Sequence, residues 1–461
     1  MKKIYFLLLF HLLIGVLTII FFDGTGDSGD SVYHYLYAKY APTDPELYFD
    51  HWAKPLYVLI ASPFSQLGFV GVKIMNLLLV NGTLLLTYLV AKQLNIQNAW
   101  LSSLMLIFSP LFFVLTFSGL TEPLFAFLLL LSFYLFFRKK WFWSCLIISF
   151  LPYVRSEGLF FIGIFGAYFI FVKNWKALLT LSIGSVAYSI AGYPFYNDFF
   201  WVFNKVPYAK MSSTYGSGDA FHFVKQLQYV IGIPIYILFW AGILSWFVDL
   251  IKKKVTLNIT YFIYGSVFAF IMAHSIFWYY GIFNSMGLNR VMICVLPLIA
   301  IIALKGFNLI YTFQINHKIQ KVLSGLIIIY IVVFPFTSNP AALDFEHELS
   351  LNLDQRLALK VTDRIDSLEI EYNTLYTNHP YMCEALEINC FDQSQKKVLS
   401  MNTLNEIETN DVIVWESWFS VVEYGIQKEV LDSNPRLELI YNVSETNYKE
   451  RTIEYALYIV K

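Results

Sequence analysis

Long apolar segments alternate with short polar ones through the first 337 residues of the chain. A bilayer core about 30 Å thick needs roughly 20 mostly apolar residues per crossing helix. The pattern predicts an all-α polytopic membrane domain over 1–337. About eleven transmembrane helices are expected, at residues 4–22, 69–91, 100–117, 120–137, 141–154, 158–172, 177–194, 229–250, 258–280, 291–312 and 319–337. Segment 141–154 would form only ~21 Å of helix, so we expect it to be partly re-entrant or shielded by its neighbours.

The pattern changes after residue 337. Residues 338–461 hold 22 of the 33 acidic residues of the chain. Alternating runs at 410–415 and 453–460 predict β-strands, and the polar stretch 352–368 predicts a helix. We therefore predict a small soluble α/β domain over 338–461.

Composition narrows the class of protein. The chain is 57% hydrophobic and only 14% charged, against about 25% charged in ordinary soluble domains. That excludes a soluble globular or a disordered protein. Basic and acidic residues number 32 and 33, so no nucleic-acid partner is expected. Of the four cysteines, Cys383 and Cys390 lie in the C-terminal domain, where they form either a disulfide or two buried thiols.

Charge asymmetry predicts the orientation. With the N-terminus in the cytoplasm, the inner segments before residue 338 hold 14 Lys and Arg residues and the longer outer segments hold 8, as the positive-inside rule requires. An odd number of spans then makes the C-terminal domain extracytoplasmic, on a plasma (inner) membrane. Ten of the eleven acidic residues before residue 338 also fall outside. They indicate an outer working surface, although solvated loop charge is an equal alternative for any single residue outside the first loop.

The first outer loop, residues 23–55, is the strongest candidate for a catalytic segment, because 33 residues exceed what a connection needs. Asp27, Asp30 and His34 are spaced three and four apart and would share one face of a helix. We expect Asp30 to be catalytic, and Asp27 and His34 are weaker candidates. The alternatives are that an acidic residue caps this helix and that His34 is a packing residue.

The same loop ends in His51-Trp52-Ala53-Lys54-Pro55, which leads into a short apolar helix over 56–67 that we expect at the interface. A lysine at headgroup depth is a natural site for a lipid phosphate, and also an ordinary membrane anchor. His51 is a supporting candidate.

Charged residues also stand at three other membrane boundaries. Arg155 and Arg290 are candidates for binding a phosphate, since arginine binds phosphate with two parallel donors. Anchoring at the interface is the alternative for each. Arg155 and Glu157 are two apart, so a local ion pair requires a non-helical turn. Glu122 either serves the start of its helix, with Thr121 as a cap, or supports the site, as Glu157 would.

The outer loop 195–228 contains Tyr215-Gly216-Ser217-Gly218-Asp219. Glycine and serine suit a mobile lid over a site, to which Tyr215 and Asp219 would contribute. A plain flexible linker is the equal alternative.

Five short motifs follow one another in the first 337 residues: Asp30-Ser31-Val32-Tyr33, Lys54-Pro55-Leu56-Tyr57, Thr121-Glu122-Pro123-Leu124, Arg155-Ser156-Glu157-Gly158, and Asn289-Arg290-Val291 with Pro297. In order and spacing they resemble those of the GT-C superfamily of polytopic glycosyltransferases. That group includes protein O-mannosyltransferases, aminoarabinose transferases and GPI-type mannosyltransferases. Two departures are a single proline after Lys54, where many members have two, and Ser31 in place of a second acid.

The resemblance implies an inverting transfer of a sugar from a polyprenyl-phosphate donor to a hydroxyl of a glycan, lipid or protein. Asp30 would be the general base, and Lys54, Arg155 and Arg290 would bind the leaving phosphate. No cofactor is expected, and a lone acid gives a divalent metal little support. The alternatives are an O-antigen ligase or polymerase, a transporter or flippase of lipid-linked saccharide, and a non-catalytic membrane anchor.

Overall fold

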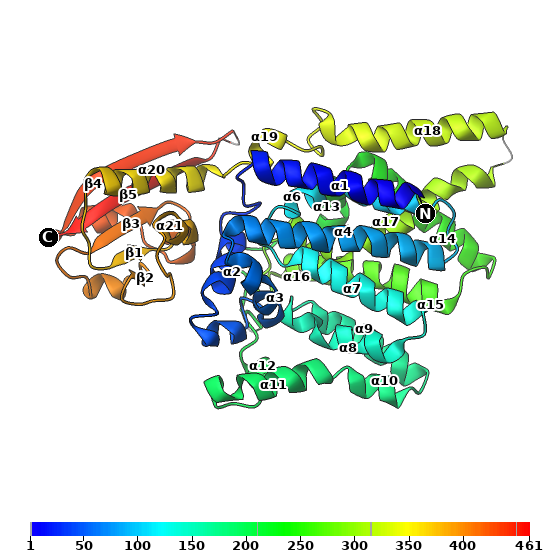
Figure 1. Ribbon diagram of the computed structural model, residues 1–461, viewed down its shortest axis with the longest axis horizontal. Helices are drawn as coiled ribbons and strands as arrows, with labels where there is room; N and C mark the ends of the chain where they lie inside the picture. Colours follow the sequence, from blue (N-terminus) through cyan, green and yellow to red (C-terminus); the bar gives the residue numbers. More distant parts are fainter. Residues whose placement is uncertain (1, 210, 314–315, 449) are drawn as a thin grey trace.

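The computed structural model describes residues 2–209, 211–313, 316–448 and 450–461. A helical bundle forms the larger part, and a small sheet domain, formed by the C-terminal residues, stands at one end of it (Figure 1). The helices of the bundle are α1 (Lys2–Phe21), α2 (Asp30–Tyr40), α3 (Pro55–Ser65), α4 (Phe69–Gln93), α5 (Trp100–Ile107), α6 (Pro110–Leu115), α7 (Glu122–Phe137), α8 (Trp141–Phe150), α9 (Gly158–Phe171), α10 (Trp175–Thr180), α11 (Ile183–Tyr196), α12 (Trp201–Asn204), α13 (His222–Ile231), α14 (Ile233–Ile251), α15 (Leu257–Ile259), α16 (Ser266–Tyr280), α17 (Leu296–Phe307) and α18 (His317–Val333).

Seven helical segments of the described chain are long and apolar enough to cross a membrane, and each matches a predicted span. They are Lys2–Phe21, Phe69–Gln93, Trp175–Tyr196, Ile233–Ile251, Leu257–Tyr280, Asn289–Thr312 and His317–Phe336. The other four predicted spans form shorter helices. Span 100–117 breaks into α5 and α6 at Pro110, which has no backbone N–H to donate. The protein is therefore a polytopic helical membrane protein, and eleven crossings stay a prediction.

Helix α17 is the buried centre of the bundle, packed against α14, α5, α4 and α7. Two glycines let α14 and α17 approach closely: a Cβ at Gly242 would collide with the carbonyl of Ile302, and one at Gly306 with that of Leu238. Small residues at such crossings are typical of membrane helix packing. At the far end from the sheet domain, Lys305 pairs with Asp249 at 2.8 Å, so two residues predicted on the cytoplasmic side lie together.

The C-terminal domain is a five-stranded sheet in the order β2-β1-β3-β5-β4. Its elements are α19 (Phe345–Glu348), α20 (Leu353–Ser367), β1 (Leu375–Thr377), α21 (Pro380–Ala385), β2 (Lys396–Lys397), β3 (Val412–Glu416), α22 (Lys428–Asp432), β4 (Leu437–Thr446) and β5 (Thr452–Val460). The first three strands in the sheet are parallel, and β3, β5 and β4 pair antiparallel. The predicted helix 352–368 and the strands 410–415 and 453–460 are confirmed as α20, β3 and β5, and with them the α/β class.

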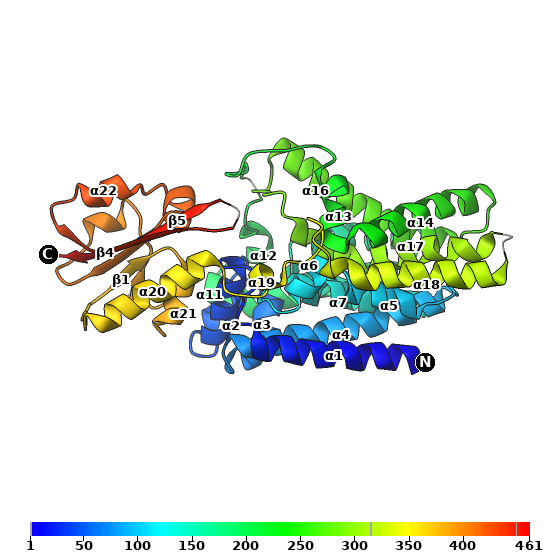
Figure 2. The same cartoon turned by 90° about the horizontal axis from the view of Figure 1, so that it is seen from above.

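The sheet domain is docked onto the first loop, so that α2 lies between the domain and the bundle (Figures 1 and 2). Glu384 of α21 accepts hydrogen bonds from Lys39 at 2.8 Å and from the Tyr35 hydroxyl at 2.9 Å. Cys383 and Cys390, at this same interface, are buried free thiols. The structure thus shows the second of the two alternatives for the cysteine pair.

Candidate functional site

The charged residues singled out in the sequence meet at the end of the bundle that faces the sheet domain. They come from the segment before α2, the start of α7, the turn before α9 and the 3₁₀ turn Asn289–Val295 that opens α17. A hydrogen bond from Gly119 N to Ser31 Oγ, at 2.6 Å, ties the chain before α7 to the start of α2. A side chain at Gly119 would collide with the backbone of Ser31, so this close approach requires glycine.

Arg290 connects three carboxylates. Its guanidinium bonds Asp27 at 2.7 Å, forms a second ion pair with Asp30, and lies 3.5 Å from Glu122 through Nε. Asp27 is also the residue that caps α2, because its Oδ1 accepts the N–H groups of Gly29 (3.0 Å) and Ser31 (3.3 Å). Capping therefore accounts for Asp27 but not for Asp30, whose side chain is 44% exposed.

Arg155 lies deeper in the same network. It pairs with Glu122 at 2.8 Å and with Glu157 at 2.8 Å, and it donates to Thr121 Oγ1 at 3.1 Å. The pair with Glu157 forms because the turn at Arg155 is not helical. Burial would raise the pKa of Glu157, but Arg155 outweighs it and lowers that pKa to about 2. The predicted capping by Thr121 is wrong: its side chain makes no cap bond and holds Arg155 instead.

Glu122 bridges the two arginines and is completely buried. Its contact with Arg155 is ionic, since neither carboxylate oxygen accepts a well-aligned hydrogen bond within the described residues. We define the charged cluster as Asp27, Asp30, Glu122, Arg155, Glu157 and Arg290.

Lys54 borders the charged cluster. Its Nζ donates to Ser156 Oγ, next to Arg155, and to the carbonyl of His51, both at 3.1 Å. Its backbone is strained, with φ at 70° just before Pro55 opens α3, as is common at functional positions. No carboxylate in the described part of the chain lies within 4.0 Å of this ammonium group. Burial lowers the pKa of Lys54 to about 8.

The two histidines of the first loop pack against neighbouring residues and do not face the charged cluster. His34 is buried, its ring stacks on Trp52 with centroids 5.0 Å apart, and its Nδ1 lies 3.2 Å from the carbonyl of Ala53. Burial lowers the pKa of His34 to about 3. His51 is also buried, with Nε2 3.0 Å from the carbonyl of Val202. These contacts favour the packing alternative for His34 and a structural role for His51.

The outer loop 195–228 splits into two parts. The Tyr215 hydroxyl donates to Glu423 of the sheet domain, and Tyr208 accepts from Trp52 Nε1 at 2.8 Å. This part of the loop thus reaches both the domain and the first loop. Asp219 does not join it: its side chain is 46% exposed and pairs with Lys225.

His274 of α16 was missed by the sequence reasoning. Its Nε2 lies 3.8 Å from Glu157, so it extends the network into the bundle. A single histidine inside an apolar span was the available signal, since polar side chains within membrane helices are commonly functional. Among the described residues, no three His, Cys, Asp or Glu side chains are grouped as a metal site.

Comparison with known proteins establishes the class of fold. No family model and no curated protein sequence matches the chain. The structure is similar to ArnT from Cupriavidus metallidurans bound to undecaprenyl phosphate, with TM-score 0.62 and 12% identity over 98% of this chain and 97% of that one. It is also similar to the same ArnT in the apo state, with TM-score 0.59 and 11% identity over 97% of each chain. A third similar structure is the Archaeoglobus fulgidus oligosaccharyltransferase in the apo form, with TM-score 0.54 and 11% identity over 91% of this chain and 70% of that one.

These neighbours define a membrane protein with the GT-C fold, the fold of polytopic membrane glycosyltransferases. The fold implied by the sequence resemblance is therefore confirmed. The likeness to ArnT spans nearly the whole chain, so it includes the C-terminal sheet domain together with the bundle.

Proposed function

We propose that the protein is an inverting glycosyltransferase that moves a sugar from a polyprenyl-phosphate donor to a hydroxyl acceptor. Reaction on the extracytoplasmic face of a plasma (inner) membrane fits the predicted orientation. Two observations support the proposal: the GT-C fold, and the structure of ArnT with undecaprenyl phosphate bound. The observation that carries it is the meeting of Asp30 with Arg290, Glu122 and Arg155 in one cluster, from segments up to 260 positions apart.

Exposure assigns the roles within the charged cluster. Asp30 is its most exposed member, so its carboxylate is the one that an acceptor hydroxyl can reach once its ion pair with Arg290 loosens. Arg290 and Lys54 would bind the leaving phosphate, because fixed cations stabilise the charge that develops as the glycosidic bond breaks. Lys54 suits this role since its ammonium group has no carboxylate within 4.0 Å in the described chain.

Donor binding and base activation are coupled in this arrangement. Arg290 forms ion pairs with Asp27 and Asp30. A donor phosphate that binds Arg290 would compete with them and loosen its hold on Asp30. The carboxylate would then be free to face the acceptor, which a carboxylate locked in an ion pair is not.

The test is transfer of a radiolabelled sugar from a polyprenyl-phosphate donor by the purified full chain. We expect Asp30→Asn to lower transfer by at least about a hundredfold while the protein inserts and folds. Asp44→Asn, in the same loop but outside the charged cluster, is the matched control and should leave transfer unchanged. Transfer by Asp30→Asn at near wild-type rate would remove Asp30 from the mechanism.

The assay also separates the alternatives. A ligase or polymerase would use a diphosphate-linked saccharide in preference to the monophosphate donor. A flippase would move lipid-linked saccharide across a vesicle membrane and form no new glycosidic bond.

A further inference from the structure

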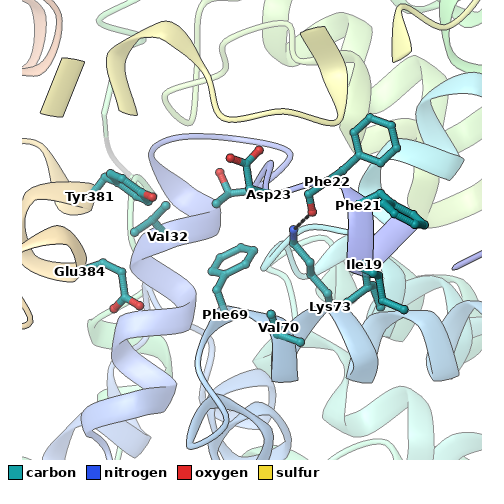
Figure 3. A pocket seen from close by; sticks show the side chains of 12 residues that line it. Ile19, Phe21, Phe22, Asp23, Val32, Phe69, Val70, Lys73, Tyr381 and Glu384 are labelled. Carbon is teal, nitrogen blue, oxygen red and sulfur yellow. Dashed lines mark hydrogen bonds between the residues drawn. The ribbon is translucent and has the colours of Figure 1, made fainter. Parts of the chain in front are cut away.

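A polar pocket at the first loop shares no lining residue with the charged cluster. It has a volume of about 450 Å³ and lies between the end of α1, the start of α4 and α21 of the sheet domain. Its polar lining consists of Lys73, Asp23, Thr25, Tyr381 and Glu384. Figure 3 shows Lys73 rising from α4 and Glu384 entering from the sheet domain across the pocket.

Lys73 is the feature that needs an explanation. It is only 3% exposed, and its Nζ donates to the carbonyl of Phe22 at 3.1 Å, which satisfies one carbonyl at the end of α1. An ammonium group has two further N–H donors. Within the described residues no carboxylate lies within 4.0 Å of it. Asp23 of the same lining acts on Lys73 electrostatically but lies beyond ion-pair distance. Buried charges are normally paired, so an anionic group of a ligand in direct contact with Lys73 would complete its pairing.

The apolar surroundings indicate that this anion belongs to a lipid. Ile20 and Phe21 line the pocket from α1 and are 66% and 74% exposed, and Val70 lines it from α4 with 47% exposed. From the pocket onward, α1 and α4 run side by side along the bundle in both views (Figures 1 and 2). Ile74 and Leu78 continue the exposed apolar row of α4 toward the membrane interior. An acyl chain would lie along this row while its headgroup occupied the pocket.

Charge complementarity specifies the headgroup. Glu384 is already neutralised by Lys39 at 2.8 Å, so the remaining charges of the lining are Lys73 and the exposed carboxylate of Asp23, one of each sign. A net-neutral headgroup that carries both a phosphate and an N–H donor matches them. A purely anionic headgroup would leave its negative charge facing Asp23.

We propose that this pocket binds a phospholipid with a phosphoethanolamine headgroup, its phosphate on Lys73 and its ammonium toward Asp23. Because Tyr381 and Glu384 belong to α21, the bound lipid joins the sheet domain to the bundle. The site is separate from the charged cluster and does not depend on glycosyl transfer.

The test is lipid binding to the full-length protein in detergent, measured by native mass spectrometry with phosphatidylethanolamine, phosphatidylcholine and phosphatidylglycerol of equal acyl chains. We expect phosphatidylethanolamine to bind about tenfold more tightly than the other two, as one charge-assisted hydrogen bond allows. Lys73→Met should weaken its binding about tenfold. Lys92→Met, the same change at the other end of α4, should have no effect.

Two further arms test the details. Asp23→Asn should bring phosphatidylethanolamine and phosphatidylcholine to similar affinities. Soluble glycerophosphoethanolamine should not displace the lipid at concentrations that saturate the lipid site, because it has no acyl chain. Stronger binding of phosphatidylglycerol by the wild-type protein, unchanged binding by Lys73→Met, or displacement by the soluble headgroup would each overturn the proposal. The wild-type lipid series keeps it testable even if Lys73→Met does not fold.

Discussion

The two arginines of the charged cluster share Glu122 but differ in their surroundings. Arg155 is enclosed by Glu122 and Glu157, and none of the three side chains is more than 17% exposed. Arg290 is as buried, at 13%, but its partners Asp27 and Asp30 are 32% and 44% exposed. An ion pair whose partners are all buried leaves no room for a ligand, whereas a ligand can displace partners that are partly exposed. We call Arg155, Glu122 and Glu157 the closed half of the charged cluster, and Arg290, Asp27 and Asp30 its open half. The difference assigns Arg155 to the stability of the site and Arg290 to its chemistry.

The largest expected effect comes from breaking the closed half. Arg155→Met leaves Glu122 buried without its nearest cation, and removal of one partner of a buried pair typically costs about 3–5 kcal/mol. We expect a large loss of thermal stability in detergent, measured by the unfolding midpoint of the purified protein. Arg138→Met changes an arginine that contacts Tyr134 near the surface and should leave the midpoint nearly unchanged.

A second substitution tests the cause of that loss. Glu122→Gln in the Arg155→Met background removes one of the two carboxylates that lost Arg155 and should recover part of the stability. Equal midpoints for Arg155→Met and the wild-type protein would contradict the division between the two arginines.

A substitution in the open half should lower the activity much more than the stability. Arg290→Lys keeps the charge but loses the two-pronged guanidinium. We expect transfer to fall by about 10²–10³, the range found when one donor that stabilises developing charge is removed. The unfolding midpoint should shift much less than in Arg155→Met. A variant with wild-type donor KM and kcat would show that Arg290 does not bind the phosphate.

Local spacing in the sequence predicted the candidate residues of the first loop and of the later membrane boundaries, but not that they contact one another. The three- and four-residue intervals of Asp27, Asp30 and His34 predicted one shared helix face, but α2 begins at Asp30, so Asp27 lies before the helix and His34 stacks on Trp52 instead of facing the charged cluster. Nothing local predicts that Arg290, 263 positions from Asp27, bonds to it, because membrane helix packing brings the two together. Only the family resemblance placed Asp30 and Arg290 in one site.

Irregular backbone is the part of the fold that apolar periodicity does not predict. The pair of Arg155 with Glu157 depends on the turn that follows the 3₁₀ helix Leu151–Tyr153. Apolar length also overestimated span 100–117, which Pro110 divides. The seven long spans were predicted well because about 20 continuous apolar residues are the signal of a helix long enough to cross a bilayer.

A smaller, pH-dependent effect distinguishes Lys54 from both arginines. Burial lowers its pKa to about 8, so the side chain is cationic below that pH and neutral above it. If its charge binds the donor phosphate, kcat/KM for the donor should fall up to tenfold per pH unit above about 8, since kcat/KM follows the free enzyme. Lys54→Arg should keep its charge and flatten the profile between pH 8 and 10. A wild-type profile that is flat in this range would exclude the charged form of Lys54 from donor binding.

The smallest effect concerns the loop 195–228, which we propose as the cover of the open half. Tyr215 joins the loop 195–228 to Glu423 of the sheet domain, and this hydrogen bond is exposed to solvent, so its net contribution is about 0.5–1.5 kcal/mol. Tyr215→Phe should therefore change the acceptor kcat/KM by about two- to tenfold and shift the unfolding midpoint much less than Arg155→Met does, because the lost bond is exposed and lies outside the charged cluster. Glu423→Gln should give a similar change, since it weakens the same bond from the other side. A loss of a hundredfold or more in Tyr215→Phe alone would mean that the hydroxyl contacts the substrate, and the loop would then belong to the chemistry of the open half instead of to its cover.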